Sequence, residues 1–202
     1  MRKYFISLII VIIFIQSCSS VKESLSPLNT YLSSKLNDND TIIVIENKIN
    51  NNFAIDFLKR SSVVRVDNNT IEGSTGLKFP LYKEEYWDIM NRRYRNKITD
   101  KVWLKTELWN RKDFRNTKIK FIREDAFPKP YVYNEYMTAK KRELSVFSFS
   151  EPIFYKNSKY VIFAKSETST KKQFIEPNSI IIMKKEKGKW IVVKEIGDYV
   201  YY

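Results

Sequence analysis

The sequence predicts an α+β domain in which an antiparallel β-meander fills the C-terminal half and helices from the N-terminal half pack on one face. From Leu144 onward, short apolar runs alternate with polar residues and are separated by tight turns. Before that point, residues 28–36 and 82–95 carry apolar side chains at helical spacing. Because the helices precede most of the strands, we expect them to cover one face of the sheet.

The first helix is expected to begin at Ser26-Pro27, where serine suits the N-cap and proline suits the first helical position. Its apolar residues repeat at helical spacing as far as Leu36, and the helix should end near Asn37. Residues 41–46, "TIIVIE", form a continuous β-branched run that predicts a buried strand.

The next stretch is less regular. We expect the three asparagines at residues 50–52 to end this strand, and residues 53–59 are ambiguous but compatible with a helical turn. Three valines at residues 63–66 suggest another strand, and residues 71–79 are expected to form a loop.

The clearest helix covers residues 82–95. Its acidic residues lie near the start and its arginines, Arg92, Arg93 and Arg95, near the end, as the helix dipole favours. The arginine cluster therefore fits a helix end better than a binding patch. Residues 102–109 could form a second helix or a strand and fit neither period cleanly, whereas residues 118–122 alternate and predict a strand.

The C-terminal half is expected to contain strands near residues 147–149, 153–155, 160–165, 179–185, 190–195 and 199–202. Asn157-Ser158 and Lys187-Gly188 supply tight turns, so neighbouring strands should be antiparallel. We expect Trp190 to be buried on the inner face. The four tryptophans, Trp87, Trp103, Trp109 and Trp190, fit core or sheet positions better than a sugar-stacking platform.

The first residues have the features of an export signal. Arg2 and Lys3 precede an apolar run, residues 5–15, which as a helix would span about 16 Å, half the hydrocarbon thickness of a bilayer. This length is typical of a signal peptide. The alternatives are a plain secretory signal and an uncleaved short anchor.

Ile15-Gln16-Ser17-Cys18 follows this run and resembles the lipobox of bacterial lipoproteins. The resemblance implies cleavage after Ser17, lipidation of the Cys18 thiol and acylation of the new amino group. It also implies export and lipid anchoring to a bacterial membrane, with the outer membrane, at its periplasmic or surface face, as the expected site. The expected organisation is a signal peptide at residues 1–17, a lipidated tether at 18–27 and one α+β domain at 28–202.

A second resemblance covers about sixty residues. The segments "FSEPIFYKNSKYVIFAK" and "KKEKGKWIVVK" are similar to the C-terminal halves of uncharacterised small bacterial lipoproteins. The similarity implies a shared β-meander and carries no activity.

The chain is strongly basic, with 36 lysines and arginines against 23 acids and a net charge of +13. Removing Arg2 and Lys3 with the signal peptide gives 13 − 2 = +11 for the mature chain. Such a charge suits a polyanionic partner, and export favours an acidic glycan or a membrane surface over nucleic acid. The alternative is a lysine-rich background spread over a solvated surface.

Several chemistries are excluded by composition. With 0 histidines, the chain lacks a Ser-His-Asp triad and His metal ligands, and lipidation would consume its only thiol. Neither a Walker A loop nor a dinucleotide-binding glycine motif occurs. We therefore expect no cofactor and no metal; the acidic tract at residues 38–40 lacks the remaining ligands of a calcium loop.

What remains is carboxylate chemistry, for which Glu84 or Glu85 could pair with Glu107 or Asp113. Each of these acids also fits a solvated or helix-capping role. The leading hypothesis is a membrane-anchored, non-enzymatic lipoprotein that works by binding. The alternatives are a carboxylate-dependent hydrolase acting on envelope glycans and an immunity-like or assembly factor with one protein partner.

Overall fold

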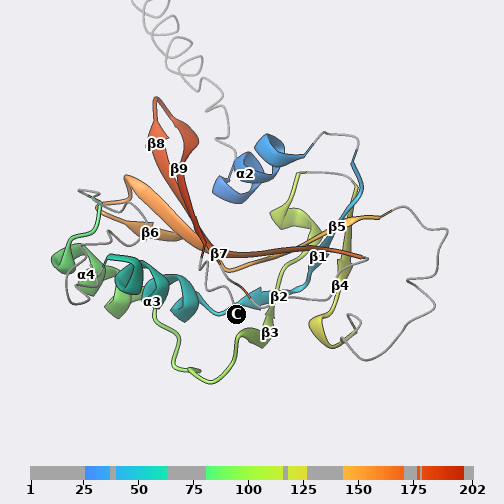
Figure 1. Cartoon of the computed structure of the whole chain (residues 1–202), viewed down its shortest axis with the longest axis horizontal. Coiled ribbons are helices and arrows are strands. Elements are labelled where there is room, and N and C mark those ends of the chain that lie inside the picture. The colour runs from blue at the N-terminus through green and yellow to red at the C-terminus, as the bar shows by residue number, and fades with distance from the viewer. Residues whose placement is uncertain are drawn as a thin grey trace, which may run out of the picture.

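The computed structural model describes residues 26–36, 40–62, 81–115, 118–126, 143–170, 177 and 179–197. Within these residues, seven strands form the main sheet (Figure 1). Their spatial order is β4 (Ile119–Ile122), β1 (Ile42–Ile45), β5 (Ser145–Phe149), β7 (Tyr160–Ser169), β8 (Ser179–Glu186) and β9 (Lys189–Gly197), with β6 (Ile153–Tyr155) paired to β7. A separate two-stranded sheet joins β2 (Asn47–Ile49) to β3 (Trp103–Leu108).

The C-terminal half is an antiparallel meander. Strand β7 pairs with β5, β6 and β8, and β8 pairs with β9, all antiparallel. The β8–β9 turn places Lys187 and Gly188 at φ 48° and 80°, the left-handed pair that a two-residue hairpin requires. The predicted α+β class and C-terminal meander are therefore confirmed.

Strand β1 lies between β4 and β5 and is parallel to both. The side chains on both faces of β1 are apolar and packed. Ile42 and Val44 belong to one core, and Ile45 belongs to another. The predicted strands at residues 41–46 and 118–122 are thus confirmed, and the continuous β-branched run reflects a central position.

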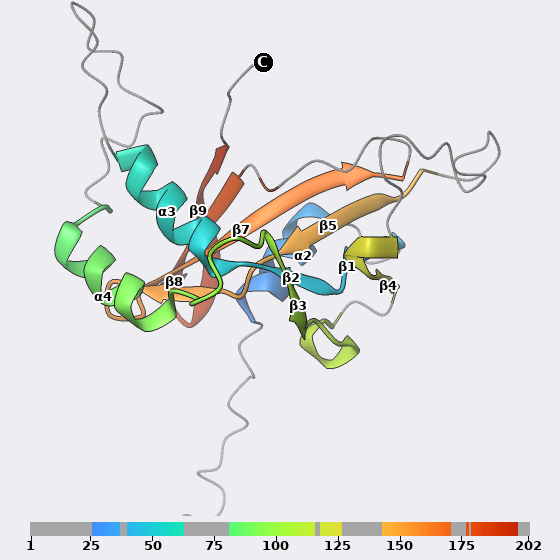
Figure 2. The same ribbon diagram turned by 90° about the horizontal axis from the view of Figure 1, so that it is seen from below.

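Three helices cover the sheet, on both of its faces. Helix α2 (Pro27–Lys35) lies on one side, whereas α3 (Asn51–Ser62) and α4 (Glu84–Tyr94) lie side by side on the other (Figures 1 and 2). Val161 and Phe163 of β7 pack in the core beneath α2, and Ile162 and Ala164 in the core beneath α3 and α4. The helices were expected on one face of the sheet; α3 and α4 do share a face, whereas α2 lies on the other. Consecutive apolar residues in β7 require a cover on each side.

The helix ends follow the predicted chemistry. The Ser26 side chain caps α2 by accepting the Asn29 amide at 3.3 Å, and Pro27 opens the helix. Helix α4 has Glu84 and Glu85 in its first turn, and two arginines in its last. Both helices are confirmed within two residues of the predicted limits.

The structure resolves two ambiguous segments. The strands end before the asparagine tract at residues 50–52, as expected, and residues 53–59 form the middle of helix α3, which is longer than a helical turn. Residues 102–109 contain β3, whose side chains are mostly exposed; its partner β2 was not expected. An exposed strand in a small sheet has no buried face, and this explains why residues 102–109 show no clear period.

Trp190 is buried, with 7% of its surface exposed, as predicted; Trp87 and Trp109 are each 8% exposed. Other expectations lie outside the described residues: Ser17 and Cys18, the strand near residues 63–66, the loop at 71–79 and the strand at 199–202. Among the described helices, none has the length and apolar character needed to cross a bilayer.

Candidate functional site

A groove of about 640 Å³ lies along α3, between this helix and the segment that leads from α4 to β3. We call it the α3 groove. Its lining residues are Asn50, Asn52, Phe53, Asp56, Lys59, Arg60, Trp87, Thr99, Asp100, Lys101 and Val102. The groove thus combines two aromatic side chains with charged groups of both signs.

Asn50 fixes one end of the groove. Its side-chain oxygen accepts the Asn52 amide at 3.0 Å and so caps α3, because the first amides of a helix have no partner within it. Its side-chain nitrogen donates to the backbone carbonyls of Ile98 at 2.6 Å and Lys101 at 3.1 Å. Asn50, only 2% exposed, therefore joins the start of α3 to the segment that forms the opposite wall.

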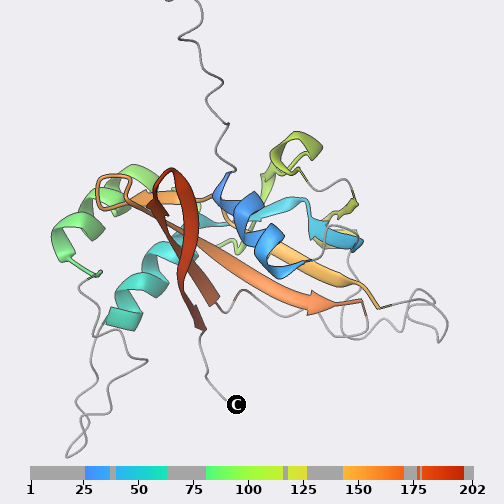
Figure 3. The ribbon, with the colours of Figure 1, turned by 90° about the horizontal axis from the view of Figure 1, so that it is seen from above.

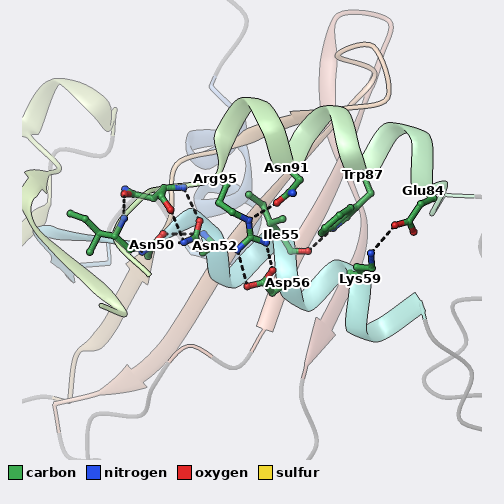
Figure 4. Close-up of polar contacts among 11 residues, drawn as sticks. Asn50, Asn52, Ile55, Asp56, Lys59, Glu84, Trp87, Asn91 and Arg95 are labelled. Carbon is green, nitrogen blue, oxygen red and sulfur yellow. Dashed lines mark hydrogen bonds and ion pairs between the residues drawn. The ribbon is translucent and has the colours of Figure 1, made fainter. Parts of the chain in front are cut away.

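Asn52 makes a second connection of the same kind. Its side-chain oxygen accepts the Asn96 amide at 2.8 Å, and its nitrogen donates to the Asn96 carbonyl at 3.0 Å. The Asn96 side chain in turn accepts the Ile98 amide at 2.9 Å. The wall of the groove is therefore held by amide groups that bind backbone atoms (Figure 4).

Trp87 of α4 forms part of the floor. Its indole N–H donates to the Ile55 carbonyl at 2.9 Å, so α4 is attached to α3. The Lys59 ammonium lies over the indole ring, 4.1 Å from its centroid, and forms an ion pair with Glu84 at 2.7 Å (Figure 4). These contacts hold the Lys59 side chain against α4, with its charge over the indole ring of Trp87.

The acids of the groove are already paired. Asp56 binds Arg95 through two guanidinium nitrogens, and Asp100 lies 3.2 Å from Lys101. The lining has three cations, Lys59, Arg60 and Lys101, and two acids, which gives 3 − 2 = +1. Arg60 is exposed, with its guanidinium 5.7 Å from the Phe57 ring centroid. The groove therefore presents positive charge beside an aromatic floor.

The predicted carboxylate pair is not brought together. Glu84 and Glu85 begin α4, whereas Glu107 accepts the side chain of Asn96, which follows the other end of that helix. An 11-residue helix is about 16 Å long, which exceeds the separation of glycosidase carboxyls. Asp113 lies beside α2, on the other face of the sheet from α4, where its backbone carbonyl accepts the Asn29 side chain at 3.0 Å. Its carboxylate accepts the Asn110 amide at 2.8 Å and so caps a 3-10 helix, η2 (Arg111–Asp113).

Glu84 also has the ionisation behaviour of an ion-pairing acid. Hydrogen bonds from Lys59 and from the Tyr82 hydroxyl hold its pKa below the usual value. A general acid that protonates a leaving group at neutral pH needs a raised pKa. Among the described residues, no group of three or more acids, histidines or cysteines is placed to hold a metal ion.

A second polar cluster lies on the α2 face. Lys165, with 7% of its side chain exposed, donates to Glu167 at 2.8 Å and to Glu195, which also lies 3.4 Å from Lys35. Burial alone would lower the Lys165 pKa, but its hydrogen bonds to the two acids raise it. Burial raises the pKa of the neighbouring Tyr31 phenol from 10.0 to about 12. The two acids thus favour the charged form of the buried Lys165 ammonium.

The asparagines of the α3 groove were missed as site residues because they resemble a turn. Ala54, Ile55 and Leu58 do follow them at helical spacing, and this pattern after an asparagine is an N-cap signal. The sequence also contains two adjacent lysines, Lys171 and Lys172, which lie at no predicted helix end and could therefore bind an anion. They lie outside the described residues. Comparison with protein-family models, curated proteins and solved structures finds no match for this chain.

Proposed function

We propose that this chain is a lipid-anchored protein of the bacterial cell envelope and that its domain is a non-enzymatic binding module. The α3 groove is the binding site, and its ligand is an acidic segment of a glycan or of a protein partner. The observation that carries the proposal is a groove of about 640 Å³ in which both lining acids are already paired and Arg60 remains exposed beside aromatic side chains.

Two properties support a binding role. The volume lies within the range of about 300–1,000 Å³ typical of ligand sites. The wall is held by Asn50 and Asn52, so a ligand would meet a preformed surface and would spend little free energy on ordering it. A carboxylate or sulfate of the ligand would pair with Arg60, while its apolar part contacts Phe53 and Trp87.

Photo-cross-linking in cells tests the groove with the full chain. A photoreactive amino acid replaces Thr99, which lines the groove, or Thr106, an exposed threonine of β3 that serves as the matched control. We expect an adduct from position 99 and none from position 106. A discrete mass increase would identify a protein partner, and a heterogeneous increase a glycan.

Charge reversal completes the experiment. Arg60→Glu should abolish the adduct from position 99, whereas Lys105→Glu, at an exposed residue of β3, should leave it unchanged. Equal adducts from positions 99 and 106, or an adduct that survives Arg60→Glu, would refute the groove as an acidic-ligand site.

The anchor is tested separately. Cys18→Ala should abolish lipid labelling and leave the precursor uncleaved, because the thiol accepts the diacylglyceryl group in proteins with a lipobox. The measurement is metabolic lipid labelling together with N-terminal sequencing of the membrane fraction. A variant that still matures to the same N-terminus would show that the lipobox interpretation is wrong.

A further inference from the structure

Two turns that are distant in the sequence lie side by side at one end of the meander. The β6–β7 turn contains Lys156 and Lys159, and the β8–β9 turn contains Lys187. The Lys185 amide donates to the Lys159 carbonyl at 3.0 Å, and Lys184 is opposite Tyr160 in the β7–β8 register. The two lysine-bearing turns therefore form one continuous surface.

This surface, the basic turn patch, comprises Lys156, Lys159, Lys184, Lys185, Lys187 and Lys189. Glu186 is the one acid within these two turns and is paired with Lys184, so the patch carries 6 − 1 = +5. Lys159, Lys185, Lys187 and Lys189 are exposed. Nearly half of the mature chain's net charge is thus concentrated at one end of the sheet.

Exposed apolar side chains flank the patch on both faces of the sheet. Phe154 is 42% exposed beside Trp190, and Ile191 is 47% exposed on the opposite face, where it pairs with Lys184. The Phe154 ring lies 6.4 Å from that of Trp190, and the Lys185 ammonium lies 5.6 Å from the Trp190 ring centroid. Flexible ammonium groups around exposed aromatic and aliphatic side chains match a bilayer interface, where headgroup phosphates lie above apolar chains.

The patch also lies close to the start of the domain. The β8–β9 hairpin stands beside α2 in two perpendicular views (Figures 1 and 3), and Leu28 of α2 shares a core with Trp190. Helix α2 is capped by Ser26, which follows Cys18 by 26 − 18 = 8 residues. Eight residues span at most about 28 Å, so an anchor at Cys18 would keep this hairpin near the membrane.

We propose that the basic turn patch binds the anionic headgroups of the membrane to which the chain is anchored. This inference rests on the proposed lipid anchor, which supplies the proximity. Each lysine held near an anionic surface strengthens the association about fivefold. The patch would orient the domain on the membrane, with the β8–β9 turn toward the lipid headgroups.

Lysine footprinting on vesicles tests this orientation with the full lipidated chain. The chain is reconstituted in phosphatidylcholine or in equal parts of phosphatidylcholine and phosphatidylglycerol, and an amine-reactive reagent labels its lysines for mass spectrometry. We expect Lys159, Lys185, Lys187 and Lys189 to be labelled more slowly on the anionic vesicles, by at least about fivefold, because several lysines act together. Lys105 and Lys120, exposed on β3 and β4, are the internal controls and should change little.

Salt and charge reversal sharpen the result. The protection should disappear at 1 M salt, where the screening length falls to about 3 Å. Lys185→Glu combined with Lys187→Glu should remove the protection of Lys159 and Lys189, whereas Lys105→Glu with Lys120→Glu should not. Equal slowing of patch and control lysines, protection that persists at 1 M salt, or protection that requires an added acidic polysaccharide would each overturn the proposal. The Cys18→Ala experiment reports on the anchor independently of these outcomes.

Discussion

The two faces of the sheet use polar groups in opposite ways. On the α2 face, the buried ammonium of Lys165 is compensated by Glu167 and Glu195, whose carboxylates are partly exposed. On the other face, the buried polar groups are neutral asparagines bound to backbone carbonyls, and the ion pairs lie at the exposed edge of the α3 groove. Enclosed charges make stability depend on pH, whereas charges around an open groove remain accessible to a ligand.

The largest loss of stability should come from a cavity in the core beneath α2. Trp190→Ala removes a buried side chain from the core beneath α2 and should lower the free energy of unfolding by about 3–5 kcal/mol. Ile191→Ala, at its exposed neighbour, is the control and should cost less than about 0.5 kcal/mol. Urea denaturation followed by circular dichroism measures both. A Trp190→Ala variant as stable as the parent would place this residue outside the core.

On the opposite face, Asn52→Ala should have an intermediate effect. It leaves the Asn96 amide and carbonyl without their side-chain partner and should cost about 1–3 kcal/mol. Hydrogen exchange should show faster exchange of the Asn96 amide, because the wall of the groove is no longer attached to α3. Asn51→Ala, at a half-buried neighbour, should preserve the protection. Unchanged exchange in Asn52→Ala would mean that the wall is held by other contacts.

The smallest effect at neutral pH is expected for Tyr31→Phe. The Tyr31 hydroxyl is buried near the Lys165 ammonium and forms no hydrogen bond of ordinary length and angle with the described residues, so its removal should change stability by less than about 1 kcal/mol. The difference appears in alkali. Because the pKa of Tyr31 is raised from 10.0 to about 12, the neutral phenol stabilises the fold below pH 10 and loses this contribution as the pH rises toward 12.

Tyr31→Phe should therefore lose less stability than the parent between neutral pH and about pH 12, by about 1.4 kcal/mol per unit of the pKa shift. Tyr31 also contributes to the raised pKa of Lys165, so the comparison reports the ionisation of the Tyr31–Lys165 pair. Denaturation curves over this pH range provide the measurement. Parallel pH profiles would show that Tyr31 ionises as freely in the folded as in the unfolded chain.

Sequence reasoning succeeded where local chemistry decides the structure. The Ser26-Pro27 start of α2, the charge distribution of α4 and the Lys187-Gly188 turn are each set by neighbouring residues, and each is present as predicted. Burial of Trp190 was also predicted correctly, because Trp190 and Val192 form an apolar stripe on one face of the strand. These features depend on a few adjacent positions, which a single sequence displays directly.

The α3 groove could not be predicted in this way because its walls come from separate elements. Asn50 acquires its role only when the segment after α4 lies within hydrogen-bonding distance, and that contact spans 48 residues. The basic turn patch was missed for a related reason, since its lysines are dispersed along the chain. The predicted turns did contain the necessary information, because alternate turns of a meander lie at the same end of the sheet.

The central position of β1 sets the order in which the fold can be built. Its partners β4 and β5 begin at residues 119 and 145, far from residues 42–45, whereas β7, β8 and β9 are near neighbours in the chain. Contacts between distant residues carry the larger loop-closure cost, so we expect the meander to form first and β1 to be inserted late. Pulse-labelling hydrogen exchange during refolding would show late protection of residues 42–45, and early protection there would contradict this order. Until β1 is inserted, the edges of β4 and β5 remain open to other chains.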